Sequence, residues 1–454
     1  MSAVLQPLFD THLRALLAEL PPLATGAKRK LVVALSGGVD SVVLLHLLSR
    51  FDMSLYPVTL QAYHVNHGLS EHAEKWTLFC QQLCETWSIP IICSQVSLVK
   101  KSRTSIEALA REARYQCFKE TMQTGDVILT GHHQDDQLET LLLALKRGSG
   151  STGLQGIRLS QRFFNGHLLR PLLLFSRQQL LEHAKYYDLT WVEDESNTNI
   201  EFDRNFLRQQ ITPQLKARWP GIAKAASRSA QLCQEQQTLL DEVAEEDCLR
   251  CESFHFSQST LCIKTLNTFS AARRNNVFRF WLKRNGLQYP SQKQLSVLWQ
   301  EVALAAEDKQ PKLTLTTHHI HRYQGRLYLV SIPGQKKTHR IMTPVQWQGE
   351  RELTLIPNEL TVDFSRVSPE LAEHHVIECC FREDLQAQLT CLPIGRHKAR
   401  YIKKLLHEYQ VPPWSRDKVV FVLLDKQLVC AVDLWQCKVN GMLLDISLLP
   451  ATTS

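Results

Sequence analysis

The sequence of 454 residues lacks any run approaching 18 consecutive apolar residues, which excludes a membrane-spanning helix. It also lacks an excess of charge, because charged residues make up 21% and apolar residues 44%, so a largely disordered chain is excluded. The first 20 residues do not join a basic start to an apolar core, and we expect no secretory signal. At roughly 100–200 residues per domain, the chain is predicted to form about two to four globular domains.

A disulfide framework is also lacking. The thirteen cysteines are odd in number and lie scattered through apolar segments, for example at Cys93, Cys262 and Cys430. Reduced cysteine packs as a small apolar residue. Together with the missing signal, this pattern predicts reduced thiols and a cytoplasmic location.

Signals for a structural metal are weak. The only C-x-x-C pair, Cys248 and Cys251, has no second pair at zinc-finger spacing, and we interpret it as two thiols on one helix face. His318, His319 and His321 lie in a strand-like pattern that turns neighbouring side chains to opposite faces and leaves no clear third ligand. We therefore predict no metal site at either place.

The first 150 residues alternate strand-like and helical patterns. Apolar or β-type runs fall at residues 31–35, 60–65, 90–96 and 127–130, with helical periodicity after each of them. This alternation predicts a doubly wound α/β domain on a parallel sheet. In such sheets, ligands bind at the carboxyl ends of the strands.

The pattern changes after about residue 215. Residues 220–250 predict one long helix, and further helical patterns follow, so we expect a mainly helical middle domain. The polar stretch 333–340 opens with Pro-Gly and is typical of a linker. Short β-type runs around one basic helical segment then predict a small α+β domain. We assign the three domains to residues 1–215, 216–332 and 345–454.

The sharpest local signal directly follows the first strand and opens a helix; it is the run Ser36-Gly37-Gly38-Val39-Asp40-Ser41. Its glycines allow a tight turn and a close approach of the backbone to a ligand. Backbone N–H groups at a helix start bind anions, and the two serines add hydroxyl donors. Asp40 suits Mg²⁺, which prefers a carboxylate with phosphate oxygens and water. The alternative is a capped glycine turn, but the strand before and the helix after favour a phosphate-binding loop.

This run resembles the PP-loop of the ATP pyrophosphatases, which cleave ATP to AMP and pyrophosphate while adenylating a substrate. Further blocks are similar to the tRNA(Ile)-lysidine synthetase family. They are His64-Val65-Asn66-His67-Gly68-Leu69, the set Glu107, Arg111, Arg114 and Tyr115, the segment from Gly131 to Thr140, Arg170 to Leu173, Asp194 to Asn197 with Arg204, Asn205 and Arg208, and, near the C-terminus, Tyr401 to Leu405 and Val411 to Arg416. The main similarity spans residues 30–210.

The resemblance implies an adenine nucleotide alpha hydrolase-like fold and a ligase. Such an enzyme uses ATP and Mg²⁺ to adenylate C2 of the first anticodon cytidine in tRNA(Ile) with a CAU anticodon. L-lysine then displaces AMP to form lysidine, which changes decoding from AUG to AUA. A homodimer is left open by the sequence.

The resemblance also suggests residue roles. The catalytic group is Asp40, Arg114, His132 and Asp136, with Asp40 as the metal ligand. The residues that the resemblance assigns to ATP binding are Ser36, Gly37, Gly38, Val39, Asp40, Ser41, His64, Asn66, Arg111, Arg114 and Gly131. Substrate binding falls to Asp135, Asp136, Glu139, Arg204, Asn205 and Arg208, with Asp136 on lysine and His132 at the reacting centre. The structural alternatives are helix capping for the histidines, the helix dipole for the carboxylates and surface ion pairs for the arginines.

A nucleic-acid surface is predicted at residues 396–418, which hold seven basic and two acidic residues with aromatic residues between them. Basic side chains neutralise phosphates, and aromatic rings stack on unpaired bases. The proposed contacts are Lys403, Lys404, Trp414 and Arg416; the alternative is a solvated basic face. The net charge of +7 permits such a partner without requiring it.

Two other functions use the same fold. A tRNA thiolase requires reactive or cluster-binding cysteines, and the sequence has only Cys80 and Cys84 at helical spacing, with none expected beside the phosphate loop. A non-catalytic tRNA-binding protein would not need the intact loop and Asp136.

Overall fold

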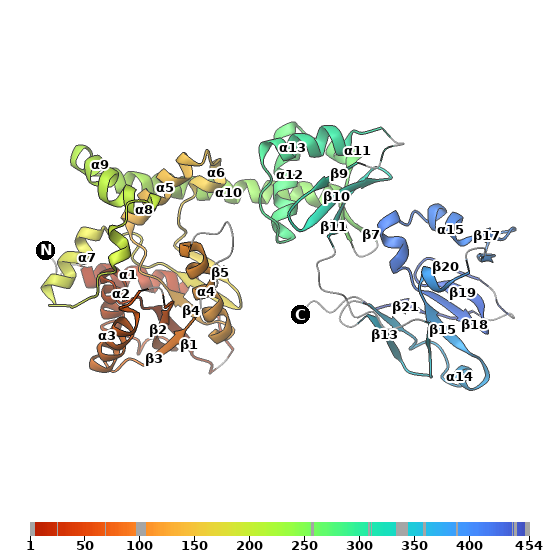
Figure 1. Cartoon of the computed structure of the whole chain (residues 1–454), viewed down its shortest axis with the longest axis horizontal. Coiled ribbons are helices and arrows are strands. Elements are labelled where there is room, and N and C mark those ends of the chain that lie inside the picture. The colour runs from red at the N-terminus through yellow and green to blue at the C-terminus, as the bar shows by residue number, and fades with distance from the viewer. Residues whose placement is uncertain are drawn as a thin grey trace. The chain divides into compact units, whose positions relative to one another are not determined.

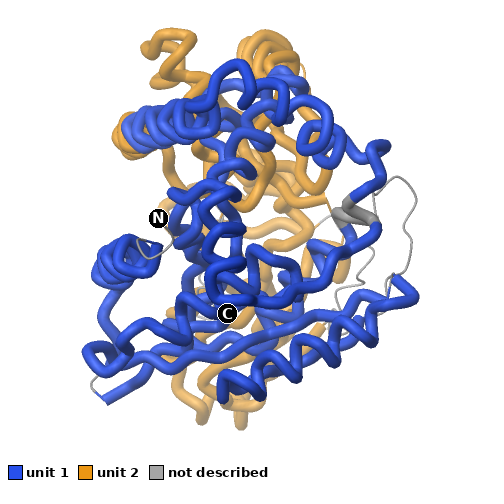
Figure 2. Tube along the Cα trace, turned by 90° about the vertical axis from the view of Figure 1, so that its left-hand side faces the viewer, with its two compact units in different colours: residues 1–239 blue, residues 240–454 orange. Residues whose placement is uncertain are grey.

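The computed structural model describes residues 5–24, 26–68, 70–96, 106–255, 258–306, 309, 311–332, 344–356, 360–386, 389–437, 439 and 443–449. The chain forms two compact units, Met1–Leu239 and Leu240–Ser454 (Figure 2). The boundary between them lies within the long helix α10 (Ile222–Cys251). The ends of this helix are close to the predicted limits, residues 220 and 250. The linker predicted at 333–340 lies outside the described residues.

Unit 1 contains a six-stranded sheet in the order β3-β2-β1-β4-β6-β5. Neighbouring strands are parallel, except that β5 and β6 form an antiparallel hairpin. The strands are β1 (Arg29–Ala34), β2 (Val58–Asn66), β3 (Ile91–Gln95), β4 (Val127–Leu129), β5 (Ser160–Phe163) and β6 (Gly166–Leu169). In the sheet, β2 lies beside β1 on one edge and β4 lies beside β1 on the other, so the strand order reverses direction at β1. A ligand crevice therefore forms at the carboxyl ends of β1 and β4.

Helices cover both faces of this sheet (Figure 1). The helices of unit 1 are α1 (Leu5–Ala18), α2 (Val39–Ser49), α3 (Ala73–Thr86), α4 (Ile106–Thr121), α5 (Gln134–Lys146), α6 (Ser151–Leu154), α7 (Arg177–Tyr186), α8 (Asp203–Phe206) and α9 (Thr212–Arg218), with a 3₁₀ turn η2 (Glu195–Thr198) and a π-helical segment η3 (Leu207–Ile211). Successive residues of β1 point to opposite faces. Leu31 and Val33 join a core with α1, α2, α3 and α7, whereas Val32 joins a second core with Phe118 of α4. The predicted doubly wound α/β fold is confirmed.

The middle region of unit 2 combines helices with a five-stranded sheet in the order β7-β8-β11-β10-β9. Its elements are β7 (Glu252–His255), β8 (Gln258–Cys262), α11 (Ile263–Leu266), α12 (Ala271–Arg284), α13 (Gln292–Val297), the π-helical segment η4 (Leu298–Ala303), β9 (Lys312–Thr314), β10 (His318–Tyr323) and β11 (Arg326–Ser331). The helices were predicted, but of the sheet only the pattern around His318–His321 was visible in the sequence. Trp281, Leu298 and Ile320 are buried together in the core of this region.

The C-terminal region has a five-stranded sheet, β12-β15-β18-β19-β20, a three-stranded sheet, β13-β14-β21, and a two-stranded pair, β16-β17. The elements are β12 (Val345–Gln346), β13 (Glu352–Ile356), β14 (Leu360–Asp363), α14 (Leu371–His374), β15 (Ile377–Cys380), η5 (Arg382–Asp384), β16 (Thr390–Cys391), β17 (Arg400–Tyr401), α15 (Ile402–Glu408), η6 (Pro413–Lys418), β18 (Phe421–Leu424), β19 (Gln427–Ala431), β20 (Trp435–Gln436) and β21 (Ser447–Leu448). Within the described ranges, no helix combines the length and apolar character needed to cross a membrane.

Candidate active site

The loop between β1 and α2 has the geometry of an anion-binding turn. Gly37 has φ +87°, and a Cβ there would lie 2.7 Å from Val192 Cγ2, so only glycine fits. The hydroxyls of Ser36 and Ser41 lie 3.1 Å apart, and that of Ser41 donates to the carbonyl of Gly38 at 2.9 Å. The serines therefore close the turn at the amino end of α2, where backbone N–H groups favour phosphate.

A second glycine brings the end of β4 against this loop. A Cβ on Gly131 would lie 2.9 Å from the carbonyl oxygen of Asp40 and 3.2 Å from the backbone nitrogen of Ser41. Contacts this short are not tolerated, so the close approach depends on glycine. The segment from Gly131 to His133 is thereby held beside the phosphate loop, as strand order alone predicts.

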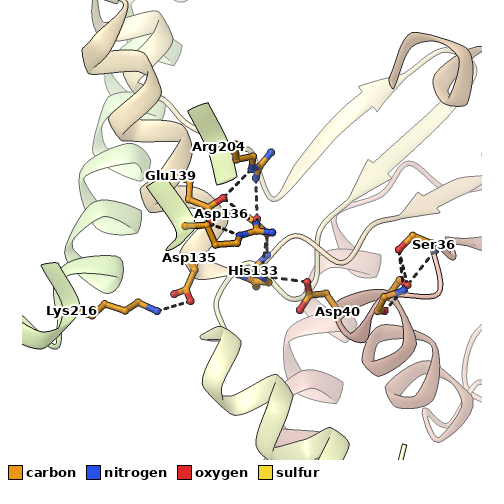
Figure 3. A network of polar contacts seen from close by, with 11 residues as sticks. Ser36, Asp40, His133, Asp135, Asp136, Glu139, Arg204 and Lys216 are labelled. Carbon is orange, nitrogen blue, oxygen red and sulfur yellow. Dashed lines mark hydrogen bonds and ion pairs between the residues drawn. The ribbon is translucent and has the colours of Figure 1, made fainter. Parts of the chain in front are cut away.

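His133 joins the loop to the acidic start of α5 (Figure 3). Its side chain is fully buried, and its Nε2 lies 3.5 Å from Oδ2 of both Asp40 and Asp136. Its backbone N–H donates to Asp136 Oδ2 at 2.9 Å. Burial lowers the pKa of His133, but the charges of Asp136, Asp40 and Asp135 outweigh burial and raise it. The sequence had singled out His132 rather than His133, so the link to Asp40 was missed.

His132 points away from the phosphate loop. The backbone of His133 is extended, with φ −125° and ψ −179°, and in extended chain neighbouring side chains point to opposite sides. Nδ1 of His132 shares a 2.8 Å hydrogen bond with Thr130 Oγ1. Burial is the main cause that lowers the pKa of His132 to about 3, with Arg170, Arg204 and Arg111 adding to it. His132 is therefore neutral at pH 7.

The carboxylates at the start of α5 are paired with cations from residues 203–218 (Figure 3). Oδ1 of Asp136 accepts from Nη2 of Arg204 and of Arg208, each at 2.9 Å. The two oxygens of Glu139 accept from the Nε atoms of the same arginines, at 2.9 and 2.8 Å. Burial raises the pKa of Asp136, but His133 and Arg204 outweigh it and hold that pKa far below its usual range. Asp136 is therefore an anion at every physiological pH.

Asp135 has a different partner. Its Oδ2 accepts from Nζ of Lys216 in α9 at 2.5 Å. Its Oδ1 is buried and has no hydrogen-bond partner among the described residues. Lys216 was not identified from the sequence, because it is 81 residues from Asp135 and lies in an ordinary helical pattern.

Asp40 fits the predicted magnesium role. Its Oδ2 faces His133, while its Oδ1 is buried without a hydrogen-bond partner in the described part of the chain. The described residues contain no group of three or more histidine, cysteine or acidic side chains that could hold a metal. A cation here would thus be held by one carboxylate together with phosphate oxygens and water, which is the set that Mg²⁺ prefers.

The residues expected at ATP from β2 and α4 lie close to this crevice in different ways. Nδ1 of His64 bonds the carbonyl of Leu35 at 2.9 Å, and Asn66 Oδ1 accepts from the Gly68 N–H at 2.8 Å. The first contact ties β2 to the end of β1, and the second shapes the turn that leaves β2. Arg114 lies with Nη2 3.5 Å from His67 Nε2, and burial lowers its pKa. The side chain of Glu107 is outside the described residues.

A cavity of about 870 Å³ lies on the His132 side of the segment from Gly131 to His133. Its lining includes His132 and five arginines, namely Arg111, Arg147, Arg158, Arg170 and Arg204. Arg170 is 4% exposed, and its Nε has no hydrogen-bond partner within the described ranges. Arg111 and Arg204 were expected at the site from the sequence. Arg147, Arg158 and Arg170 were given no role there, because their spacing in the sequence does not show that they line one cavity. A cavity with this excess of positive charge fits a phosphate-rich ligand.

The C-terminal residues predicted to contact RNA lie in unit 2. Lys403 and Lys404 are exposed on α15. Trp414 stacks on His321, with ring centroids 4.5 Å apart, and its Nε1–H donates to Gln258 Oε1 at 3.2 Å. Arg416 Nε donates to the carbonyl of Val411 at 3.1 Å. Trp414 therefore already has an aromatic neighbour within its own unit.

Asn205 lies in α8, directly after Arg204. Its Nδ2 donates to the carbonyl of Asn199 at 2.9 Å. This bond fixes the turn that leads into α8, and so it helps to position Arg204 next to it.

The fold and the crevice define a PP-loop nucleotide-binding protein, and comparison with known families agrees. A model described as "PP-loop domain" matches residues 7–215. Models described as "TilS substrate binding domain" and "TilS substrate C-terminal domain" match residues 261–328 and 377–440.

Whole-chain relatives identify the family. The chain is 40% identical to a tRNA(Ile)-lysidine synthase of Serratia proteamaculans over 90% of this chain and 92% of the relative. It is 41% identical to that of Shigella flexneri over 89% of this chain and 91% of the relative. The chain belongs to the tRNA(Ile)-lysidine synthase family. A solved U34-tRNA thiolase of Methanococcus maripaludis matches 50% of this chain and 79% of its own at 18% identity, with a TM-score of 0.41, too low to carry an argument.

Proposed function

We propose that the chain ligates lysine to C2 of the first anticodon cytidine of tRNA(Ile) with a CAU anticodon, using ATP and releasing AMP and pyrophosphate. One observation carries the proposal. The short segment from Gly131 to His133 separates a phosphate loop from an arginine-lined cavity, with the carboxylates of α5 directly after it. Nucleotide, RNA base and amino acid can therefore meet at one place.

The first step joins the cytidine to AMP. The loop from Ser36 to Ser41 holds the ATP phosphates, and the cytidine O2 attacks the α-phosphorus as pyrophosphate leaves. Asp40 would hold Mg²⁺, which would supply positive charge to the phosphates when bound. Arg114 adds a fixed cation near the developing negative charge.

The second step exchanges AMP for lysine. The lysine ammonium loses a proton to water, the resulting amine attacks C2, and the C2–O2 bond breaks as AMP leaves with that oxygen. Asp136 remains ionised because His133 and Arg204 hold its pKa far below its usual range, and Arg204 and Arg208 also pair with Glu139. His132 is a weak proton acceptor, since its pKa is about 3, and it suits the task of positioning the neutral base by a hydrogen bond.

The RNA is held at more than one place in this proposal. The cavity arginines bind phosphates of the anticodon loop next to the reacting cytidine. Lys403, Lys404 and Arg416 of unit 2 bind phosphates elsewhere on the tRNA, and Trp414 supports that surface through its stack on His321. We expect the reaction to take place in the cytoplasm.

One cysteine lies beside the phosphate loop, which bears on the thiolase alternative. We expected no cysteine beside the phosphate loop, and this is wrong: a Cβ on Gly37 would lie 3.3 Å from Cys80 Sγ. Folding of α3 against the loop brings Cys80 there. However, burial raises the pKa of Cys80 to about 12, so its thiol is protonated and a poor nucleophile.

The test supplies purified protein with ATP, Mg²⁺, labelled lysine and unmodified tRNA(Ile) bearing CAU. Label at the first anticodon base, with one AMP released per lysine incorporated, is the expected result. Sulfur-dependent modification would replace the proposal by the thiolase, and tRNA retention without AMP release would leave only a binding protein.

A further inference from the structure

Residues 203–218 supply an internal cation to every carboxylate at the start of α5. Arg204 and Arg208 pair with Asp136 and Glu139, and Lys216 pairs with Asp135. A substrate ammonium that binds one of these carboxylates competes with the internal cation for the same negative charge. The structure therefore raises the question of which cation is displaced.

Lys216 is the cation held least firmly. Arg204 and Arg208 each contact both Asp136 and Glu139, and Glu139 is 1% exposed. Removing either arginine would leave buried carboxylates without enough positive charge, which is costly. Among the described residues Lys216 makes one ion pair, with Asp135, and its side chain is 34% exposed, against 28% for Arg204 and 29% for Arg208. Its flexible stem can turn the ammonium group into water.

Asp135 belongs to the site although its partner comes from α9. Its carboxylate is one of the three that raise the pKa of buried His133, which also contacts Asp40. The side chain of Asp135 is only 8% exposed. Its Oδ1 is buried and has no hydrogen-bond partner among the described residues, so it can accept a further N–H donor.

We propose that Lys216 is a resident ammonium in the amino-acid subsite, and that an ammonium group of the lysine substrate displaces it from Asp135. This inference rests on the proposed lysine ligation and goes beyond it by naming the residue that sets affinity for the amino acid. Lys216 carries the same ammonium group as the substrate, so the exchange conserves the charge at Asp135. Substrates without an ammonium group in reach of Asp135 cannot make this exchange.

The experiment measures kcat and KM for lysine with saturating ATP and tRNA, in wild type and in two variants. Lys216→Met removes the competing ammonium and is expected to lower KM for lysine at least threefold, with kcat within twofold. Lys216→Arg puts a two-pronged donor on Asp135 and is expected to raise KM at least threefold. Lys283→Met is the matched control, because Lys283 pairs with Asp241 at 2.7 Å in unit 2, and its KM is expected to stay unchanged.

The inference predicts a lower KM because the competing ammonium is gone, whereas loss of a purely structural ion pair would not improve affinity for lysine. An unchanged or higher KM in Lys216→Met, at wild-type thermal stability, would therefore overturn the inference. If Lys216→Met does not fold, the KM of Lys216→Arg decides, and a value equal to wild type overturns the inference. Failure of the proposed function is distinguishable, because it appears as no lysine incorporation by the wild type itself.

Discussion

Gly131 lies against Asp40 so closely that a Cβ on the glycine would be 2.9 Å from the aspartate carbonyl oxygen. The two residues are 91 positions apart in the sequence. Their contact brings the segment after β4 against the first turn of α2. It aligns the phosphate loop with the start of α5, which carries the acidic residues. The closeness of these two backbones decides whether nucleotide and RNA base can meet.

Gly131→Ala should therefore push the loop away from β4. We expect AMP formation to fall at least tenfold, because a small misplacement of reacting groups costs about 10²-fold in rate. The measurement is release of pyrophosphate with tRNA present. Gly221→Ala is the control, since no atom lies within 4 Å of a Cβ at Gly221, and a similar loss in both variants would contradict the explanation.

Asp40→Ala should abolish AMP formation and leave tRNA retention on a filter intact. In the proposed function the Asp40 carboxylate would hold magnesium beside the phosphates, whereas the cavity arginines would bind the RNA. Asp40→Asn keeps the shape but lacks the charge, and it should fail in the same way. Loss of tRNA retention together with AMP formation would contradict this division of roles.

The resemblance suggests an ATP contact for Arg111, but its place in the cavity wall favours an RNA phosphate, so Arg111→Gln should weaken tRNA binding severalfold without changing ATP binding. Arg111 lines the cavity, and its Nη2 donates to Tyr115 OH at 3.0 Å. Each lost phosphate contact lowers the slope of log K against log salt by about 0.7–0.9. Filter binding across salt concentrations measures this slope. An unaltered slope in Arg111→Gln would mean that the RNA binds elsewhere. Arg366→Gln is the control: Arg366 pairs with Asp445 in unit 2, and its replacement should leave the slope unaltered.

Stability should fall as pH drops from about 6.5 toward 4, because of a buried histidine pair behind the phosphate loop. His46 Nδ1 and His183 Nε2 lie 3.0 Å apart, between α2 and α7. Burial is the main cause that lowers the pKa of each to about 4. The unfolded chain therefore binds more protons in this range, and each histidine adds a slope of up to ~1.4 kcal/mol per pH unit.

Denaturant unfolding between pH 8 and pH 4.5 checks this prediction. The double variant His46→Gln, His183→Gln should show a shallower loss of stability on acidification than the wild type. A loss of equal steepness would assign the effect to other buried histidines, such as His132.

Cys80→Ala should retain most of the lysine-ligating activity. The thiol packs against Gly37 but has its pKa raised to about 12 by burial, so it contributes packing rather than chemistry. Lysine incorporation measures the outcome. A loss of activity with wild-type thermal stability would revive a role for sulfur chemistry at this loop.

The sequence predicted those parts whose signal is local. The loop from Ser36 to Ser41 is predicted from consecutive residues, and helix α5 (Gln134–Lys146) follows the run 127–130, where helical periodicity was expected. The sheet of the middle region was largely missed. Its strands are three to six residues long and carry polar residues at many positions, so neither a long apolar run nor clean alternation marks them.

The roles of the acidic residues could be predicted only in part. Asp135, Asp136 and Glu139 were grouped with Arg204 and Arg208 as substrate contacts, and their separate roles remain proposals. Their mutual ion pairs were not foreseen, because Asp136 and Arg204 are 68 residues apart. Nothing in the local pattern indicates that α8 and η3 pack onto α5.

By itself the sequence determined the phosphate loop, the alternation that forms the parallel sheet and the family of the chain, because each depends on residues close together or on their order. Only the tertiary structure decided that His133 contacts Asp40, that Lys216 pairs with Asp135 and that scattered arginines share one cavity. The physical reason is that charges separated by many residues interact only after packing has brought their helices together and removed the water between them.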